Sequence, residues 1–160
     1  MGYRLSLLIL FLVACSSPPP VAPQGPAQVP AVTLVSLDHG AASLPALTHG
    51  RPALVAFWAT WCPSCARELA ELDRLQARVG SDAVVVGVAV GEPYERVADF
   101  LRPRRLAYAQ LVDEEFKLSE ALGARRVPST LVIDRAGAVR YAGGTLDPAA
   151  LAALRDAMAH

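Results

Sequence analysis

The 160-residue sequence lacks several features on which large classes of protein depend. Its 15 basic and 15 acidic residues cancel to a formal net charge of zero, so no basic footprint points to a nucleic acid partner. The N-terminal apolar run, residues 5–13, is far shorter than the roughly 20 residues that a membrane-spanning helix needs. No internal repeat occurs, and Lys117 is the only lysine, an imbalance that we attribute to codon usage. Neither a nucleic-acid-binding protein nor a repeat protein is therefore supported.

What is present suits one folded domain. The length allows a single well-cored domain but is too short for two. The apolar content of 53% is typical of a globular protein. Only three cysteines occur, with Cys62 and Cys65 close together and Cys15 alone. An odd cysteine in an exported protein needs an explanation, and the N-terminus offers one.

The N-terminal residues have the pattern of an export signal. Arg4 is the only charge before the apolar run, which has the length of a signal-peptide core. The run ends in Leu12-Val13-Ala14-Cys15, which resembles the bacterial lipobox, a signal whose cysteine is lipidated and becomes the first residue of the mature chain. We therefore expect residues 1–14 to be a lipoprotein signal peptide and Cys15 to be lipidated. An ordinary signal peptide is the alternative, whereas the nominal N-myristoylation pattern of residues 1–6 is disfavoured because an export segment follows it at once.

A proline-rich stretch follows Cys15. Residues 16–30 contain six of the 13 prolines and carry no charge, so they cannot bury enough surface to fold. In an extended polyproline conformation at ~3.1 Å per residue, such a stretch would reach on the order of 45 Å. We expect residues 15–31 to be a tether and residues 32–160 to be the folded domain. A proline-rich peptide ligand has little support because no basic residues flank the stretch.

The folded region alternates strand and helix patterns, which predicts an α/β protein. Continuous apolar runs at residues 53–58 and 83–90 are typical of strands buried on both faces. An apolar stripe predicts a helix over residues 63–79. The remaining patterns predict strands at 32–37, 42–44, 106–112, 129–133 and 139–142, and helices around 97–101, 115–122 and 148–158. The first strands and helices form a βαβ unit and the last strands a hairpin, so we expect a mixed sheet with helices on both faces.

The most informative segment is Trp61-Cys62-Pro63-Ser64-Cys65, between a predicted strand and the helix after it. A helix N-terminus stabilises a thiolate through its dipole and free N–H groups, so a Cys-x-x-Cys pair there suits dithiol–disulfide exchange. A permanent disulfide would close a tiny loop and stabilise little. A zinc site needs about four ligands, and His39, His49 and His160 are not at ligand-like spacings. We therefore expect a redox-active pair with no metal and no separate cofactor.

These residues resemble a known family. The segment from Phe57 to Cys65 resembles the active site of thioredoxin-like proteins, and more narrowly the TlpA/ResA group of membrane-tethered bacterial thiol–disulfide oxidoreductases. Val127-Pro128-Ser129-Thr130 is similar to the cis-proline loop of that family. The resemblance covers about residues 32–159 and implies a thioredoxin-like fold. One position departs from it: Ala56 stands where typical thioredoxins have a buried aspartate that accepts a proton.

The resemblance also implies roles for individual residues. Cys62 would be the exposed nucleophile, and Cys65 would resolve the mixed disulfide. Pro63 and Ser64 would tune the pair, with Ser64 either donating a hydrogen bond or serving as a small helix starter. Glu68 stands where ResA-like members carry a functional glutamate; it would accept a proton from Cys65 or disfavour its thiolate, unless it is only a solvated carboxylate.

The surroundings of the pair have implied roles as well. Pro128 would be cis and would present the loop that follows Val127 to a substrate peptide. Trp61 would form part of the substrate-facing surface. Arg125 and Arg126 precede this loop and would either favour an acidic partner or form an ordinary solvated face.

The leading hypothesis is an exported, lipid-anchored thiol–disulfide oxidoreductase on the extracytoplasmic side of the cell envelope. It would act as a reductant or isomerase on exported thiol or disulfide proteins, for example apocytochrome c, with a membrane thiol carrier as electron donor. A peroxiredoxin-like peroxidase is a weaker alternative because its pattern needs proline and threonine where this chain has Val55 and Ala59. A copper metallochaperone using Cys62 and Cys65 is a third hypothesis, since soft thiolates suit Cu(I), but no third ligand is evident.

Overall fold

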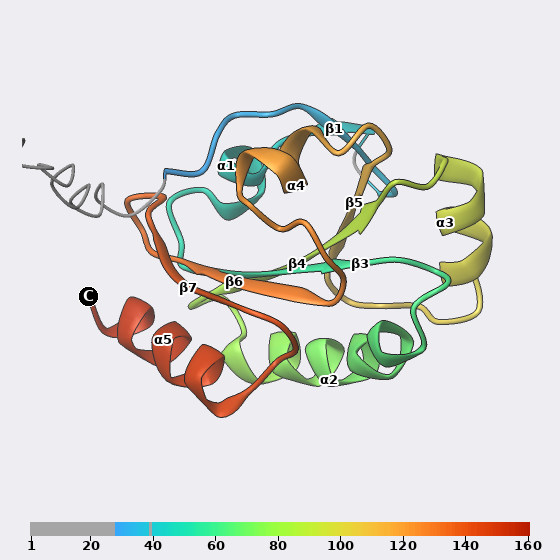
Figure 1. The fold of residues 1–160 in the computed structure, drawn as a ribbon. Helices are drawn as coiled ribbons and strands as arrows, with labels where there is room; N and C mark the ends of the chain where they lie inside the picture. The colour runs from blue at the N-terminus through green and yellow to red at the C-terminus, as the bar shows by residue number, and fades with distance from the viewer. Residues whose placement is uncertain (1–27, 39) are drawn as a thin grey trace, which may run out of the picture.

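The computed structural model describes residues 28–38 and 40–160 (Figure 1). The predicted signal peptide, Cys15, most of the predicted tether and His39 lie outside these described residues. Within them, no helix is both long and apolar enough to cross a bilayer. The strands are β1 (Leu34–Ser36), β2 (Gly40–Ala42), β3 (Ala53–Trp58), β4 (Val84–Val90), β5 (Ala109–Asp113), β6 (Ser129–Ile133) and β7 (Val139–Gly143); the helices are α1 (Leu44–Thr48), α2 (Pro63–Val79), α3 (Tyr94–Leu101), α4 (Lys117–Ala121) and α5 (Pro148–Ala159).

The strands form one mixed sheet in the order β2-β1-β5-β4-β3-β6-β7. The three central strands are parallel, with Val55 of β3 paired to Val86 of β4 and Val88 of β4 paired to Leu111 of β5. The outer pairs are antiparallel, including the hairpin of β6 and β7. The predicted mixed sheet with a parallel centre is therefore confirmed.

Helices cover both faces of the sheet, as predicted (Figure 1). On one face, Leu44 of α1 and Leu118 of α4 pack against the side chains of alternate strand residues such as Val55. On the other face, Leu72 of α2 and Leu154 of α5 pack against the intervening positions of the same strands. Every residue of β3 and β4 is consequently buried, which is why both strands are continuous apolar runs in the sequence.

The largest error of the sequence analysis lies before β3. The predicted strand at 42–44 is wrong, because β2 ends at Ala42 and the chain turns into α1 at Leu44. The Ser43 hydroxyl accepts a hydrogen bond from the backbone N–H of Ala46 at 3.4 Å, and Pro45 stands in the first turn of the helix. A side-chain cap and a first-turn proline are both typical of a helix start. The sequence analysis interpreted the short apolar run at 42–44 as a strand instead.

Smaller differences concern the ends of elements. Strand β5 starts at Ala109 rather than at residue 106, and Ala107 instead donates its backbone N–H to the carboxylate of Asp73 at 2.6 Å. Helix α4 starts only at Lys117. At the start of the domain, the backbone N–H of Val29 donates to the carbonyl of Gly137 at 2.9 Å, so the last residues of the predicted tether lie against the domain.

Candidate active site

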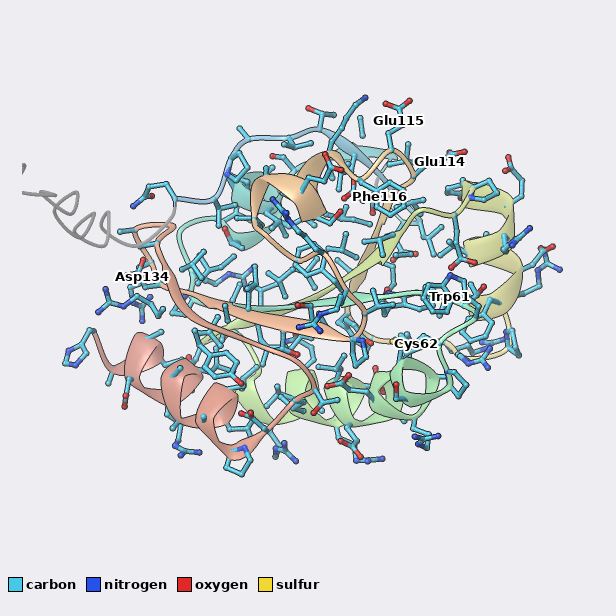
Figure 2. The ribbon with its side chains drawn as sticks, viewed as in Figure 1. Trp61, Cys62, Glu114, Glu115, Phe116 and Asp134 are labelled. Carbon is cyan, nitrogen blue, oxygen red and sulfur yellow. A yellow bond between two sulfur atoms is a disulfide. The ribbon has the colours of Figure 1, made fainter. Side chains whose placement is uncertain are left out.

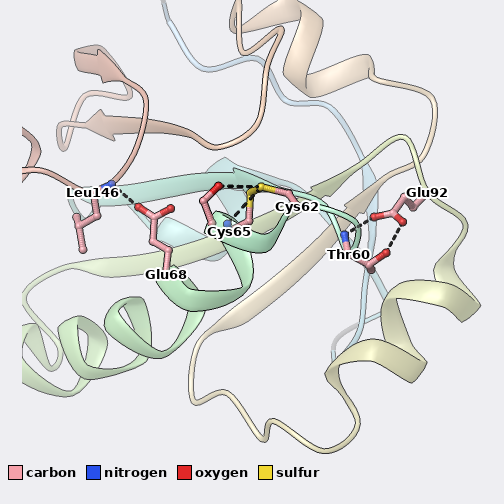
Figure 3. The surroundings of a disulfide bond; sticks show 7 residues. Thr60, Cys62, Cys65, Glu68, Glu92 and Leu146 are labelled. Atoms are coloured by element: carbon pink, nitrogen blue, oxygen red, sulfur yellow. Dashed lines mark hydrogen bonds between the residues drawn. A yellow bond between two sulfur atoms is a disulfide. The ribbon is translucent and has the colours of Figure 1, made fainter.

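Cys62 lies at the junction between the central strand β3 and helix α2. It is the N-cap residue of α2, with an extended backbone, and Pro63 follows at the first helical position, which suits proline because no hydrogen bond needs its missing N–H. The Cys62 Sγ accepts a hydrogen bond from the backbone N–H of Cys65 at 3.2 Å. The two cysteines form a disulfide (Figure 3). The Cys62 sulfur thus lies where the helix N-terminus favours negative charge once the disulfide is reduced.

The expectation that Cys62 is the exposed cysteine is wrong for this oxidised form. Cys62 is 4% exposed and Cys65 is 1% exposed, and both belong to an apolar cluster with Trp58 and Leu69. The neighbouring Trp61 is the residue that faces solvent, with 67% of its surface exposed. In this form the exposed surface next to the pair is that of Trp61, while both sulfur-bearing residues are covered.

Ser64 contacts the Cys62 sulfur directly. Its Oγ lies 3.3 Å from the Cys62 Sγ. A disulfide sulfur carries no hydrogen, so the Ser64 hydroxyl is the donor in this state. Of the two interpretations of Ser64, the geometry supports the hydrogen-bond donor, which would also stabilise a Cys62 thiolate after reduction.

Glu92 fixes the loop in front of the cysteines, a contact that the sequence analysis missed. Its carboxylate is buried and accepts the backbone N–H of Thr60 at 2.6 Å and the hydroxyl of Thr60 at 2.5 Å (Figure 3). Arg96 lies 3.9 Å from the same carboxylate. Since Glu92 stands between β4 and α3, it connects the segment that leads into α3 to the loop that carries Trp61. Nothing near Thr60 in the sequence marks a partner 32 residues away.

Glu68 is a buried carboxylate one helical turn after Cys65. It accepts a hydrogen bond from the backbone N–H of Leu146, in the loop between β7 and α5 (Figure 3). Burial raises the pKa of Glu68, the bond from Leu146 opposes this, and the nearby charge of Glu71 adds to the rise. The alternative of a solvated carboxylate is therefore wrong. Since residue 56 is an alanine and carries no acid, Glu68 is the buried carboxylate that α2 offers one turn after Cys65.

Substituting Glu68 by glutamine is expected to change how stability depends on pH. A folded-state pKa above the ordinary glutamate value means that the folded protein binds the proton more tightly than the unfolded chain. The contribution of the Glu68 proton to the free energy of unfolding is fully present below the ordinary glutamate pKa. It is lost as the pH rises through the raised pKa of the folded protein. Urea unfolding of the oxidised protein at a series of pH values should show that decline, and Glu68→Gln should flatten it.

Glu95→Gln provides the matched control, because it makes the same substitution at an exposed position on α3 and leaves Glu68 in place, so the decline should persist. A Glu68→Gln profile that declines as steeply as that of the wild type would show that Glu68 does not titrate in this way.

The loop before β6 completes the surroundings of the pair. The peptide bond between Val127 and Pro128 is cis, as the family resemblance implied. Val127 packs against the cluster that contains both cysteines, and it lines a surface groove together with Trp61. The structure therefore brings together Trp61, both cysteines and Val127 from two distant parts of the chain. Among the described residues, no group of three or more His, Cys, Asp or Glu side chains is placed to hold a metal ion.

A Cys-x-x-Cys disulfide at the start of a helix after a central strand, next to a cis-proline loop, defines the class of thioredoxin-like redox proteins. The family profile described as AhpC/TSA matches residues 26–142. The chain belongs to this family.

Named relatives agree with the predicted group. The thiol:disulfide interchange protein DsbE of Escherichia coli (strain K12) is 36% identical over 124 residues, which cover 75% of this chain and 65% of that protein. The thiol-disulfide oxidoreductase ResA of Geobacillus thermodenitrificans is 30% identical over 93 residues, covering 58% of this chain and 53% of the relative. The chain thus spans less than two thirds of the length of these relatives. The resemblance to the TlpA/ResA group is confirmed.

A solved structure confirms the fold. The crystal structure of a putative thiol:disulfide interchange protein DsbE from Chlorobium tepidum superposes with a TM-score of 0.73 and 23% sequence identity. The superposition covers 85% of this chain and 96% of the other. The predicted thioredoxin-like α/β fold is therefore correct.

Proposed function

We propose that the protein catalyses thiol–disulfide exchange with protein substrates through Cys62 and Cys65. The observation that carries the proposal is the disulfide between these residues, with the Cys62 Sγ at the N-terminus of α2. In the reduced protein, the Cys62 thiolate attacks one sulfur of a substrate disulfide, and the other substrate sulfur leaves as a thiolate that takes up a proton. Cys65 then loses its proton and attacks the Cys62 Sγ, which releases the second substrate thiol. Two electrons pass from the dithiol to the substrate.

The neighbouring residues support this sequence of steps. Ser64 donates a hydrogen bond to the Cys62 sulfur, and the helix N-terminus stabilises the same atom as a thiolate. Cys65 is buried, so its proton needs an acceptor within the protein. Glu68 is our candidate, since its raised pKa brings proton exchange closer to neutral pH.

For the setting of the reaction, we propose a tethered enzyme outside the cytoplasm. Residues 1–14 would be a signal peptide, Cys15 would carry the lipid, residues 15–31 would form the tether, and residues 32–160 would be the catalytic domain. The lipobox-like sequence before Cys15 supports this organisation. Mass spectrometry of the mature N-terminus tests it: a lipid on Cys15 is expected, and a chain that keeps Met1 would contradict it.

We also propose the direction of electron flow. An oxidising compartment would keep the pair oxidised, so a reductant or isomerase needs a supply of electrons, for which a membrane thiol carrier is suited. Its substrates would be exported thiol or disulfide proteins, with apocytochrome c as one example. The names of the relatives, which refer to disulfide interchange and oxidoreduction, support exchange chemistry of this kind.

The decisive experiment combines turnover with trapping. The reduced full-length protein is mixed with a disulfide-bonded model peptide, and loss of the peptide disulfide is followed with time. Cys65→Ala should accumulate a mixed disulfide between Cys62 and the peptide, because the resolving sulfur is missing. The proposal is wrong if the wild type exchanges no disulfide while it consumes hydroperoxide or binds copper stoichiometrically, as the two alternatives predict.

A further inference from the structure

Two large apolar side chains stay exposed beside the active site. Trp61 is 67% exposed and Phe116 is 47% exposed, and both line a groove of about 970 Å³. Val127, which packs against the cysteine cluster, lines the same groove. Figure 2 shows Trp61 close to Cys62, with Phe116 farther up in the same half of the view. The groove therefore begins at the residue that precedes the nucleophile.

The fold holds Phe116 in this place despite a local cost. Its φ of 59° is in the left-handed region, where a bulky residue is strained. The ring lies against the backbone of Gly91, so closely that a Cβ at that position would overlap the ring carbon Cζ. Gly91 itself has a φ of 67°. Glycine is thus required at residue 91 both for its conformation and for the approach of the ring.

A buried carboxylate maintains the turn that carries Phe116. Asp113 is fully buried, and its carboxylate accepts the backbone N–H groups of Leu118 at 3.3 Å and Ser119 at 2.8 Å. Its backbone carbonyl accepts the N–H groups of Gly91 at 3.0 Å and Phe116 at 3.2 Å. These hydrogen bonds keep the strained backbone of Phe116 in place although its ring is exposed. Backbone strain that is maintained in this way is typical of functional sites, so it indicates that the exposed ring belongs to a functional surface.

The groove also has an excess of positive charge. Arg125 and Arg126 line it and are exposed, and within residues 28–38 and 40–160 neither forms an ion pair. Lys117, which also lines the groove, is paired with Glu115 at 2.6 Å. Glu120 is the acidic residue of the lining. Two unpaired arginines against one carboxylate favour an acidic ligand.

We propose that this groove docks an extended segment of the protein substrate that has an apolar side chain and carboxylates next to its disulfide. The apolar side chain would lie between Trp61 and Phe116, and the carboxylates would meet Arg125 and Arg126, which leaves the disulfide beside Cys62. This inference rests on the proposed exchange activity and adds a substrate class to it. Arg125 and Arg126 would either favour an acidic partner or form an ordinary solvated face, and this proposal adopts the acidic partner.

The test uses three disulfide-bonded peptides that differ only in having glutamate, glutamine or lysine residues next to the cysteines. At low salt, the wild type should prefer the acidic peptide over the basic one in kcat/KM by about fivefold to tenfold, as expected for a few exposed ion pairs. The preference should shrink as salt is added. Arg125→Glu combined with Arg126→Glu should reverse it.

Arg78→Glu combined with Arg155→Glu makes the same change in net charge at exposed positions at the far end of α2 and on α5. This control should keep the wild-type preference. If the control loses the preference as well, or if the wild type treats the three peptides alike, the docking site is refuted. If the wild type reduces none of the peptides and no small uncharged disulfide, the exchange activity itself is refuted.

A second variant separates binding from folding. Phe116→Asn removes the ring but keeps a residue that tolerates a positive φ. Its Tm should therefore not fall, whereas KM for the acidic peptide should rise about tenfold, as for loss of a central aromatic anchor. A lower Tm with an unchanged KM would show that the ring is only structural.

Discussion

Serine in place of Cys62 is expected to lower kcat/KM for disulfide exchange by more than about 10³-fold, as loss of an attacking nucleophile does in other enzymes. A serine hydroxyl is not ionised near neutral pH and cannot form a disulfide, so neither the attack nor its resolution takes place. Cys65 is not expected to take over, because it lies inside the first turn of α2 and not at the N-cap position that Cys62 occupies. The rate of peptide reduction by stoichiometric reduced protein measures the effect.

Cys15→Ser is the matched control for this substitution, since it also removes one sulfur but changes a residue far from the pair in sequence. It should exchange disulfides at the wild-type rate in solution. A Cys62→Ser protein that keeps more than a tenth of the activity would show that Cys65 or another group is the nucleophile.

Leu69→Ala is expected to lower the free energy of unfolding by ~2–5 kcal/mol. Leu69 is buried on α2, in the cluster that contains both cysteines together with Trp58 and Val97. Truncation would leave a cavity within this cluster, because the surrounding residues relax only partly into the space of a removed side chain. Urea unfolding of the oxidised protein measures the loss.

Val35→Ala on the edge strand β1 is the control for Leu69→Ala. The Val35 side chain is exposed, so its truncation should cost less than about 1 kcal/mol. Equal losses for the two variants would contradict the assignment of Leu69 to the support of the site.

The parts of the site that could be predicted are those whose cause is local. Cys62 and Cys65 are separated by one helical turn, and Pro63 between them is suited to the first position of a helix. The buried strands before and after α2 are visible as continuous apolar runs because both of their faces are covered. The cis bond before Pro128 came from the family resemblance and not from the residues themselves.

The parts that were missed depend on contacts between distant segments. Thr60 meets Glu92 only because β3 and β4 are neighbouring parallel strands, whose carboxyl ends lie at the same edge of the sheet. Glu68 meets Leu146 across 78 residues, which decides that its carboxylate is buried and not solvated. The burial of Cys62 has the same kind of origin, since Val127 packs against its cluster from the far end of the chain.

By itself, the sequence determined that this protein has an α/β domain with a redox-active cysteine pair at a strand–helix junction. Helix starts, buried strands and turns follow from the residue types within a few positions, so they can be recognised along the chain. The tertiary structure alone decided which face of the site meets solvent, that Glu68 is buried, and that Phe116 lies against Gly91 to form one wall of a groove. These features depend on the order and register of the strands, because these bring together residues that are far apart in the sequence. No pattern within a few positions of either residue marks such a contact.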